Sequence, residues 1–429
     1  MVQQRIRFGG ELRRRRLAAG LTLGDLAGMV HYSKSQLSKV ERGLKAPSRE
    51  LARHCDSKLN AGGALAALVR ERPSTTEIAE MSDDSEEVWL MQLSEDGRNL
   101  FQPVSRRQMM AAGAVSIAGM SIGGQGVSSA AEETTLLGAS RSLFDQYRQL
   151  GQTVRPGLLL PVLIAQTGTL RELAATAGPR TRQGLLKLGS RYAEYVGWLM
   201  QESGNEQAAL WWTRRAVDLA AAGGDRDLAA YGLVRRALVT LYRQDAGQTV
   251  ELARRAQDDG SPPRIRGLAA QREAQGHALA GDYDACMRSL DRARALLASH
   301  VPDSDTPVIG TTNLSDPAGM ITGWCLYDLG RPGEAAEVMD EQMAQVPAHA
   351  VRTQVRYGVR RALAHAAAGE IDHACDLVTR LLGSAVTVSS ATITADLRAL
   401  ARTLARHTRN ASVRALAPEL NMALQIDVS

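Results

Sequence analysis

The sequence predicts an all-α protein in which a small helical domain is followed by an α-solenoid of stacked helix pairs. Aromatic residues make up only 4% of the 429 residues, and Ala, Leu and Gly are abundant. This composition favours helix over sheet. Helix caps and glycine stops fill the first 70 residues, and a similar turn recurs through the last 300. The length predicts two or three domains.

Charge divides the chain into three regions. Residues 1–72 hold 15 Lys/Arg against 6 Asp/Glu, residues 73–104 hold 1 against 8, and the remaining 325 residues hold 35 against 32. A concentrated basic region indicates a polyanion partner. We therefore expect a basic head at 1–72, an acidic linker with a small-residue apolar segment at 73–135, and a helical body at 136–429.

The four cysteines, Cys55, Cys286, Cys325 and Cys375, are far apart and form no CxxC pair. This spacing argues against a disulfide framework and a structural zinc site, and it fits a reducing cytoplasm. The N-terminus is polar and charged, unlike a secretory signal.

The head contains signals for five short helices. Two of them begin with a capping-box spacing, in which Ser or Thr is followed three residues later by an acidic or amide side chain. In chain order the signals are a stop at Gly20, boxes at Thr22–Asp25 and Ser33–Gln36, a stop at Gly43, a start at Pro47–Ser48, and a start after Gly62–Gly63.

The second and third predicted helices are joined by a tight turn at His31-Tyr32, which is typical of a helix-turn-helix. Leu26 and Val30 form the apolar face of the second helix, and Leu37 and Val40 form that of the third. These two faces are expected to pack together.

Residues 11–59 resemble the phage-repressor-type (Cro/Xre) DNA-binding domain. The resemblance rests on LRRRRLAAGLTLGDLA and SKSQLSKVERGLKAPS, and its most specific part is Val40-Glu41-Arg42-Gly43 followed by Pro47. His31 stands where the family usually has glycine, and His tolerates positive φ better than most residues. The resemblance implies that the third helix enters the major groove of DNA.

The resemblance also implies which residues contact DNA. Lys34, Ser35, Ser38 and Lys39 would face base edges, and Thr22, Arg42 and Lys45 would contact phosphates. Gln36 either reads adenine or serves only as the capping partner of Ser33. The run Arg13–Arg16 is either a solvated helix face or a phosphate contact. The predicted DNA-binding set is Thr22, Ser33, Lys34, Ser35, Gln36, Ser38, Lys39, Arg42 and Lys45.

Residues 73–104 are typical of a solvated linker. Trp89, Leu90 and Leu93 indicate a short docking helix within it. Because its charge is opposite to that of the head, the segment either lies against the DNA-binding face or acts as a plain linker.

Ser-Arg-Arg at 105–107 precedes an uncharged stretch of 19 residues, Met109–Val127. This pattern resembles a twin-arginine export signal, and the stretch is long enough to span a bilayer. Its internal position and its Gly, Ala and Ser content favour a small-residue helix or a flexible connector instead.

The body carries a recurring turn of Gly, a polar residue and then Ala on a helix. It occurs at Gly204–Ala208, Gly281–Ala285, Gly330–Ala335 and Gly369–Ala374, with a degraded copy at Gln244–Gly247. The successive spacings are near 40, 37, 49 and 39 residues, a period that indicates stacked helix pairs. The longest interval, which contains Pro302, Pro307 and Pro317, predicts an insertion or a lengthened loop.

This period and the Ala positions resemble tetratricopeptide repeats (TPR), most clearly in residues 198–216. The resemblance implies a superhelix whose concave surface, lined by the first helix of each pair, binds a peptide or protein. The residues predicted on that surface are Tyr192, Tyr195, Tyr231, Arg235, Gln271, Gln275, Arg356, Tyr357 and Arg360.

No catalytic chemistry is predicted. His365, His373 and Cys375 are near one another in the sequence, but neither HExxH nor paired-cysteine spacing occurs, and there is no Walker loop. We expect a protein that is not an enzyme, with no catalytic residue, metal or cofactor.

These patterns predict a sequence-specific DNA-binding transcription regulator. The head and body together resemble the peptide-sensing quorum regulators of Gram-positive bacteria and actinobacterial regulators with TPR bodies. This resemblance implies a double-stranded DNA operator, a peptide or protein ligand, a homodimer, and a cytoplasmic, nucleoid-associated location. Two alternatives stay open: an adaptor whose repeats recruit another regulator or a polymerase component, and a regulator tethered to a membrane by residues 109–127.

Overall fold

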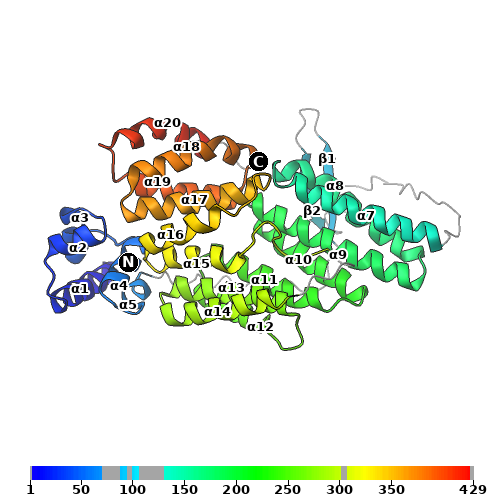
Figure 1. Cartoon of the computed structure of the whole chain (residues 1–429), viewed down its shortest axis with the longest axis horizontal. Helices are drawn as coiled ribbons and strands as arrows, with labels where there is room; N and C mark the ends of the chain where they lie inside the picture. Colours follow the sequence, from blue (N-terminus) through cyan, green and yellow to red (C-terminus); the bar gives the residue numbers. More distant parts are fainter. Residues whose placement is uncertain (1, 70–86, 94–98, 106–129, 301–306, 426–429) are drawn as a thin grey trace.

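The computed structural model describes residues 2–69, 87–93, 99–105, 130–300 and 307–425. Within these residues the fold is all-α except for one two-stranded hairpin. The described secondary structure of the head and of the body is helical, as the predicted fold class requires. The five-helix head lies at one end of a long stack of helices (Figure 1).

Polar caps begin three of the head helices. The hydroxyls of Thr22, Ser33 and Ser48 each accept a hydrogen bond from the amide three residues later. Phe8, Leu12, Leu26, Leu37 and Leu51 are fully or almost fully buried in the core between the helices. The fifth helix begins directly after Gly63, as predicted. The helices are α1 (Val2–Ala18), α2 (Leu23–Met29), α3 (Lys34–Glu41), α4 (Arg49–Lys58) and α5 (Ala64–Ala67).

The connector contains a hairpin where a short helix was predicted. Strand β1 (Glu87–Leu93) pairs antiparallel with β2 (Asn99–Ser105). The helix prediction at Trp89–Leu93 is therefore wrong, because a seven-residue run with Val and Trp suits an extended strand once a second strand satisfies its backbone. The predicted apolar segment Met109–Val127 lies outside the described residues.

The body alternates long helices with short turns. The five recurring turns all join paired helices, as the period predicts, and the residue at the start of each adopts a positive φ, Gln244 included. The long interval lies between α14 and α15, and its described residues 307–316 form no helix or strand, as a lengthened loop requires. The body helices are α7 (Ala130–Leu150), α8 (Pro156–Thr176), α9 (Pro179–Glu202), α10 (Glu206–Ala222), α11 (Asp227–Tyr242), α12 (Ala246–Arg255), α13 (Pro263–Ala280), α14 (Tyr283–Ala298), α15 (Pro317–Asp328), α16 (Pro332–Met343), α17 (Val351–Ala368), α18 (Ile371–Val388), α19 (Ala391–Leu404) and α20 (Ala411–Gln425).

Helix α8 is, among the described residues, the one helix that is long and apolar enough to cross a membrane. It packs along α9, and Leu159, Leu163 and Leu170 belong to the hydrophobic core there. The apolar side chains on that side of α8 are therefore buried within the protein.

Helix α17, late in the stack, contacts the α7–α8 connection and α9 near its beginning. Arg352 on α17 donates hydrogen bonds to the carbonyl oxygens of Gly151 and Val154, 2.8 and 2.5 Å away, in the connection between α7 and α8. The same guanidinium forms an ion pair of 3.3 Å with Glu202 at the end of α9, and both side chains are buried. These contacts join α7–α9 to α17, and a cavity lies between them.

Candidate nucleic-acid interface and central cavity

Helix α3 presents a polar face to solvent. Its apolar residues Leu37 and Val40 are buried in the head, so the opposite face points outward. The residues predicted to read bases are on or beside that face: Lys34, Ser35 and Lys39 are exposed, and Gln36 and Ser38 are half-buried.

The two predicted capping boxes differ. Thr22 and Asp25 form a complete box, in which the Thr22 hydroxyl accepts from the Asp25 amide and the Asp25 carboxylate accepts from the Thr22 amide. Ser33 caps α3 through the Gln36 amide, but the Gln36 side chain makes no reciprocal bond to the Ser33 backbone. The Gln36 side chain is therefore not committed to the cap.

Cations gather on the α3 side of the head without acidic partners. Lys34, Lys39, Arg42 and Lys45 are all exposed, and none of the ion pairs among the described residues includes them. Unpaired cations on one face suit contact with phosphates, which fix the register of a DNA-binding protein on the duplex.

The Arg13–Arg16 run is mostly engaged within the protein. Arg16 binds Glu41 at 2.6 Å, with both side chains buried, and it also donates to the Leu21 carbonyl. This pair fixes α1 to the end of α3 and accounts for the glutamate in the most specific part of the resemblance. Hydrogen bonds from Arg14 and Arg15 lower the pKa of Glu11 to about 2.

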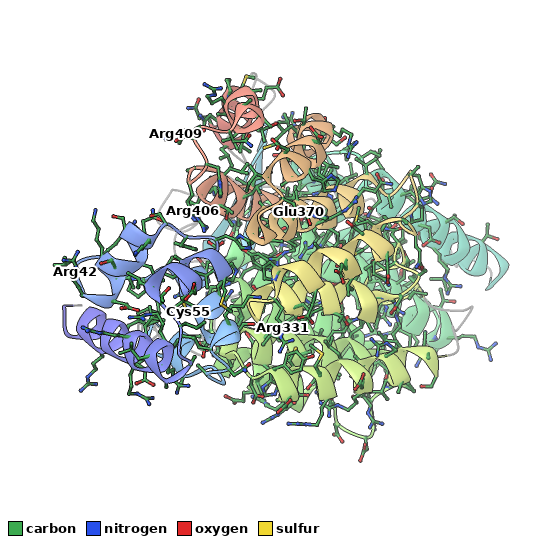
Figure 2. All side chains as sticks on the ribbon, turned by 60° about the vertical axis from the view of Figure 1, so that its left-hand side comes forward. Arg42, Cys55, Arg331, Glu370, Arg406 and Arg409 are labelled. Atoms are coloured by element: carbon green, nitrogen blue, oxygen red, sulfur yellow. The ribbon has the colours of Figure 1, made fainter. Side chains whose placement is uncertain are left out.

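The head docks on the body through α4. Arg53 forms an ion pair of 3.0 Å with Asp328 at the end of α15. Glu50 binds Arg406 at 2.5 Å, and the Arg406 guanidinium lies 4.4 Å from the centre of the Tyr32 ring. Figure 2 shows Arg406 and Arg331 on the side of the body that meets the head, whereas Arg42 lies on the far side of the head.

Glycine turns of the body make the close contacts of this interface. A Cβ on Gly281, at the α13–α14 turn, would lie 2.8 Å from the Cα of Gly63 in the head. His31 has a φ of 54°, and its ring lies against Gly369 at the α17–α18 turn, where an added Cβ would be 3.0 Å from the ring. The histidine that departs from the family pattern thus contacts the body.

The sequence pattern did not predict this interface. Arg53, Glu50 and Arg406 carry no motif, and their partners are hundreds of residues away. The one available signal was His31 in place of the usual glycine, because a bulky side chain at a left-handed turn indicates a further contact.

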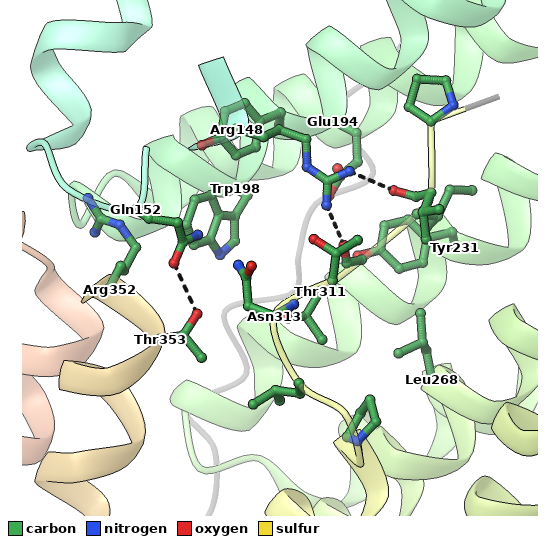
Figure 3. A pocket seen from close by; sticks show the side chains of 18 of the residues that line it. Arg148, Gln152, Glu194, Trp198, Tyr231, Leu268, Thr311, Asn313, Arg352 and Thr353 are labelled. Atoms are coloured by element: carbon green, nitrogen blue, oxygen red, sulfur yellow. Dashed lines mark hydrogen bonds between the residues drawn. The ribbon is translucent and has the colours of Figure 1, made fainter. Parts of the chain in front are cut away.

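The central cavity has a volume of about 610 Å³ and is lined by the first helices of successive pairs (Figure 3). Of the residues predicted on the concave surface, six line it: Tyr195, Tyr231, Arg235, Gln271, Arg356 and Tyr357. Three do not. Tyr192 is buried and donates to the Ser140 carbonyl, Gln275 is fully buried, and Arg360 is paired with Asp396.

Residues 307–314 of the loop between α14 and α15 also line the cavity. Arg148 donates to the Val308 and Gly310 carbonyls at 3.0 and 2.8 Å, and Arg264 donates to the Ile309 and Thr311 carbonyls at 2.8 and 2.6 Å. Burial lowers the pKa of Arg264. The lengthened interval in the repeat was the sequence signal for this segment, although its role in the cavity was not predicted.

Glu194 is one of two carboxylates that line the cavity. Burial raises its pKa, and Arg235, at 3.4 Å, opposes that shift. Figure 3 shows Glu194 near Tyr231 and Arg148, with Trp198 and Gln152 facing the segment that carries Thr311 and Asn313.

No group of three metal-ligating side chains occurs in the part of the chain that the structure describes. His365 and His373 do lie together, with ring centres 4.6 Å apart, but His365 bonds to Asp340 and Glu370. All four cysteines are buried and free, as their spacing predicts. A Gly-x-Ser-x-Gly pentapeptide, which can carry a nucleophilic serine, does occur at 119–123, outside the described residues.

Comparison with curated proteins and comparison with solved structures each gave no match for this chain. Comparison with protein families shows that residues 7–69, the head described above, match the family of the helix-turn-helix domain.

Proposed function

We propose that the chain is a sequence-specific transcription regulator, in which α3 reads the major groove and the body binds a signal ligand in its cavity. The observation that carries the first part is the surface of α3. Lys34, Lys39, Arg42 and Lys45 are exposed and free of acidic partners, while the head docks on the body through α4 and the His31 turn. DNA can therefore approach α3 without displacing the body.

A short chain of contacts supports coupling between cavity and head. Trp324 lines the cavity, and its indole N–H donates to one carboxylate oxygen of Asp328 at 3.1 Å. The other oxygen of Asp328 accepts from Arg53 of the head at 3.0 Å. A ligand that moves Trp324 would thus act on the carboxylate that holds α4.

Helices α13 and α17 also connect the cavity to the head. Gln271 on α13 and Tyr357 on α17 line the cavity. Each helix then ends at a turn that contacts the head, through Gly281 and Gly369 respectively. We propose that the ligand shifts the curvature of the body and with it the position of the head. Only a ligand that binds two curvatures with different affinity can do so.

We further propose that the chain acts as a homodimer and that the body is TPR-like. Helix-turn-helix dimers place their recognition helices on half-sites about 34 Å apart. Light scattering on the full-length protein, alone and with DNA, measures the oligomeric state. A monomer under both conditions would contradict the dimer.

Selection of duplexes from a random double-stranded DNA library tests the main proposal. The expected result is an enriched motif that the wild-type protein binds and the Lys34→Ala/Lys39→Ala variant binds about 100-fold more weakly, because each good base contact contributes about 1–3 kcal/mol. Lys58→Ala, which removes an exposed lysine of α4 outside the predicted contact set, is the matched control. Selection without an enriched motif, or equal loss in the control, would contradict the proposal.

A further inference from the structure

The lining of the central cavity is rich in arginine. It contains seven arginines and two carboxylates, those of Asp145 and Glu194. A volume of about 610 Å³ is in the range of sites for small organic ligands, roughly 300–1,000 Å³. The arginines are Arg141, Arg148, Arg191, Arg235, Arg272 and, from α17, Arg352 and Arg356.

Several buried atoms of the lining have no hydrogen-bond partner, and all of them can donate. Gln271 is 1% exposed, yet its amide nitrogen has no partner within the described structure. The Tyr195 hydroxyl and the Nε atoms of Arg141 and Arg191 are in the same condition. A buried donor without an acceptor is costly, so such a set indicates that a ligand supplies the acceptors.

Arg272 lies beside Gln271 and lacks a carboxylate partner in the described part of the chain. One of its nitrogens donates to the Gln275 amide oxygen at 2.6 Å. Burial lowers its pKa, and the nearby Arg356 lowers it further. An anion beside Arg272 would stabilise its buried positive charge.

Aromatic rings form another part of the wall. The Tyr195 and Trp198 rings stack at 5.4 Å with an angle of 17°, and the Trp324 and Tyr357 rings meet edge to face at 6.4 Å. All four line the cavity. Such surfaces suit a flat apolar body, while the arginines and Gln271 suit an acidic group.

We propose that the cavity binds a small organic anion, with its acidic group toward Arg272 and Gln271 and a flat apolar body against Trp198 and Trp324. The inference rests on the proposed function, since it names the chemical class of the signal that the body receives.

Fluorescence titration with two matched probes tests this assignment. 8-Anilinonaphthalene-1-sulfonate and N-phenyl-1-naphthylamine share one aromatic body, and only the first is an anion. On the full-length protein we expect one sulfonate site per chain and binding at least about tenfold tighter than that of the neutral amine, as one charge-assisted hydrogen bond supplies. Equal affinity for both probes would overturn the proposal.

Variants locate the site. Arg272→Met and Gln271→Leu should each weaken sulfonate binding, the first by about 10- to 100-fold, and leave amine binding unchanged. Arg255→Met, on an exposed arginine of α12, is the control and should change neither. Unchanged sulfonate binding in both cavity variants would overturn the proposal, as would displacement of the sulfonate by acidic pentapeptides but not by 2-naphthoate.

The same preparations separate this inference from the proposed function. If the protein shows no preference for the sulfonate but still binds its DNA motif, only the proposed ligand class is wrong. If the sulfonate binds selectively but no DNA motif is enriched, the proposed regulator function is wrong and the anion site is retained.

Discussion

Basic side chains have different surroundings in the head and in the body. On the α3 side of the head, Lys34 and Lys39 are exposed and free of acidic partners. In the body, Arg352 is 2% exposed and binds Glu202 together with backbone carbonyls. Charge that is left free serves an external polyanion, whereas charge that is buried and bonded joins distant parts of the chain. Net charge alone does not distinguish these uses.

The largest effect is expected when the buried ion pairs of the body are removed. Burial favours the neutral form of Glu202, but Arg356, Arg352 and the hydroxyls of Ser390 and Thr392 lower its pKa. Glu202→Ala leaves two buried guanidinium groups without their anion. We expect the free energy of unfolding of the body to fall by about 3–5 kcal/mol, measured by chemical denaturation of the full-length protein.

Glu337→Ala is the control for that variant, because Glu337 is exposed on α16. The control should change the stability by less than about 0.5 kcal/mol. If both variants unfold at the same denaturant concentration, the ion pair does not hold the body closed.

The second effect concerns the stability of the head. Burial lowers the pKa of His54 to about 4 from an ordinary value of 6.5. The neutral form is thus favoured in the folded head, and its contribution is complete above pH 6.5. It is lost as the pH falls from about 6.5 to about 4, because the unfolded chain takes up the proton first. The full loss is about 3 kcal/mol for a shift of this size.

Hydrogen exchange of α4 peptides between pH 7 and pH 4, corrected for the intrinsic rates, measures this loss. His54→Leu should flatten the dependence, since it removes the titrating group while keeping a buried apolar side chain. A variant with the same pH dependence as the wild-type protein would show that another group is responsible.

The smallest effect tests the contact between the two regions. Asp328→Asn removes the charge that Arg53 binds, and the pair is largely buried, with side-chain exposures of 12% and 9%. We expect about a tenfold rise in the exchange of α4 and α5 amides, which corresponds to about 1.4 kcal/mol of docking free energy. Asp284→Asn, on an exposed aspartate of α14, should leave the exchange unchanged.

Local sequence patterns predicted the local structure well. The turns at Gly204, Gly281, Gly330 and Gly369 are helix-pair turns because glycine adopts the positive φ there without strain. The α3 face followed from the spacing of Leu37 and Val40, which fixes what points outward. The strand at Glu87–Leu93 was missed because short apolar runs are compatible with either a helix or a strand.

Contacts between distant residues could not be predicted in this way. Arg53 and Asp328 are 275 positions apart, and Arg352 and Gly151 are 201 apart. Neither residue type nor spacing identifies such partners, since they meet only once the stack has formed. The same reason explains Tyr192 and Arg360, which were predicted on the concave surface but bind Ser140 and Asp396, 52 and 36 positions away.

The dependence of DNA affinity on salt tests the central claim most directly, that the exposed cations on the α3 side of the head face the duplex. The logarithm of affinity for the selected duplex is plotted against the logarithm of salt concentration, for the wild-type protein and for Arg42→Ala/Lys45→Ala, which removes the two cations predicted to contact phosphates. Each cation that neutralises a phosphate contributes about 0.9 to the slope. We predict a weaker affinity for the variant at every salt concentration and a slope that is shallower by up to about 2. Superimposable lines for the two proteins would contradict the account.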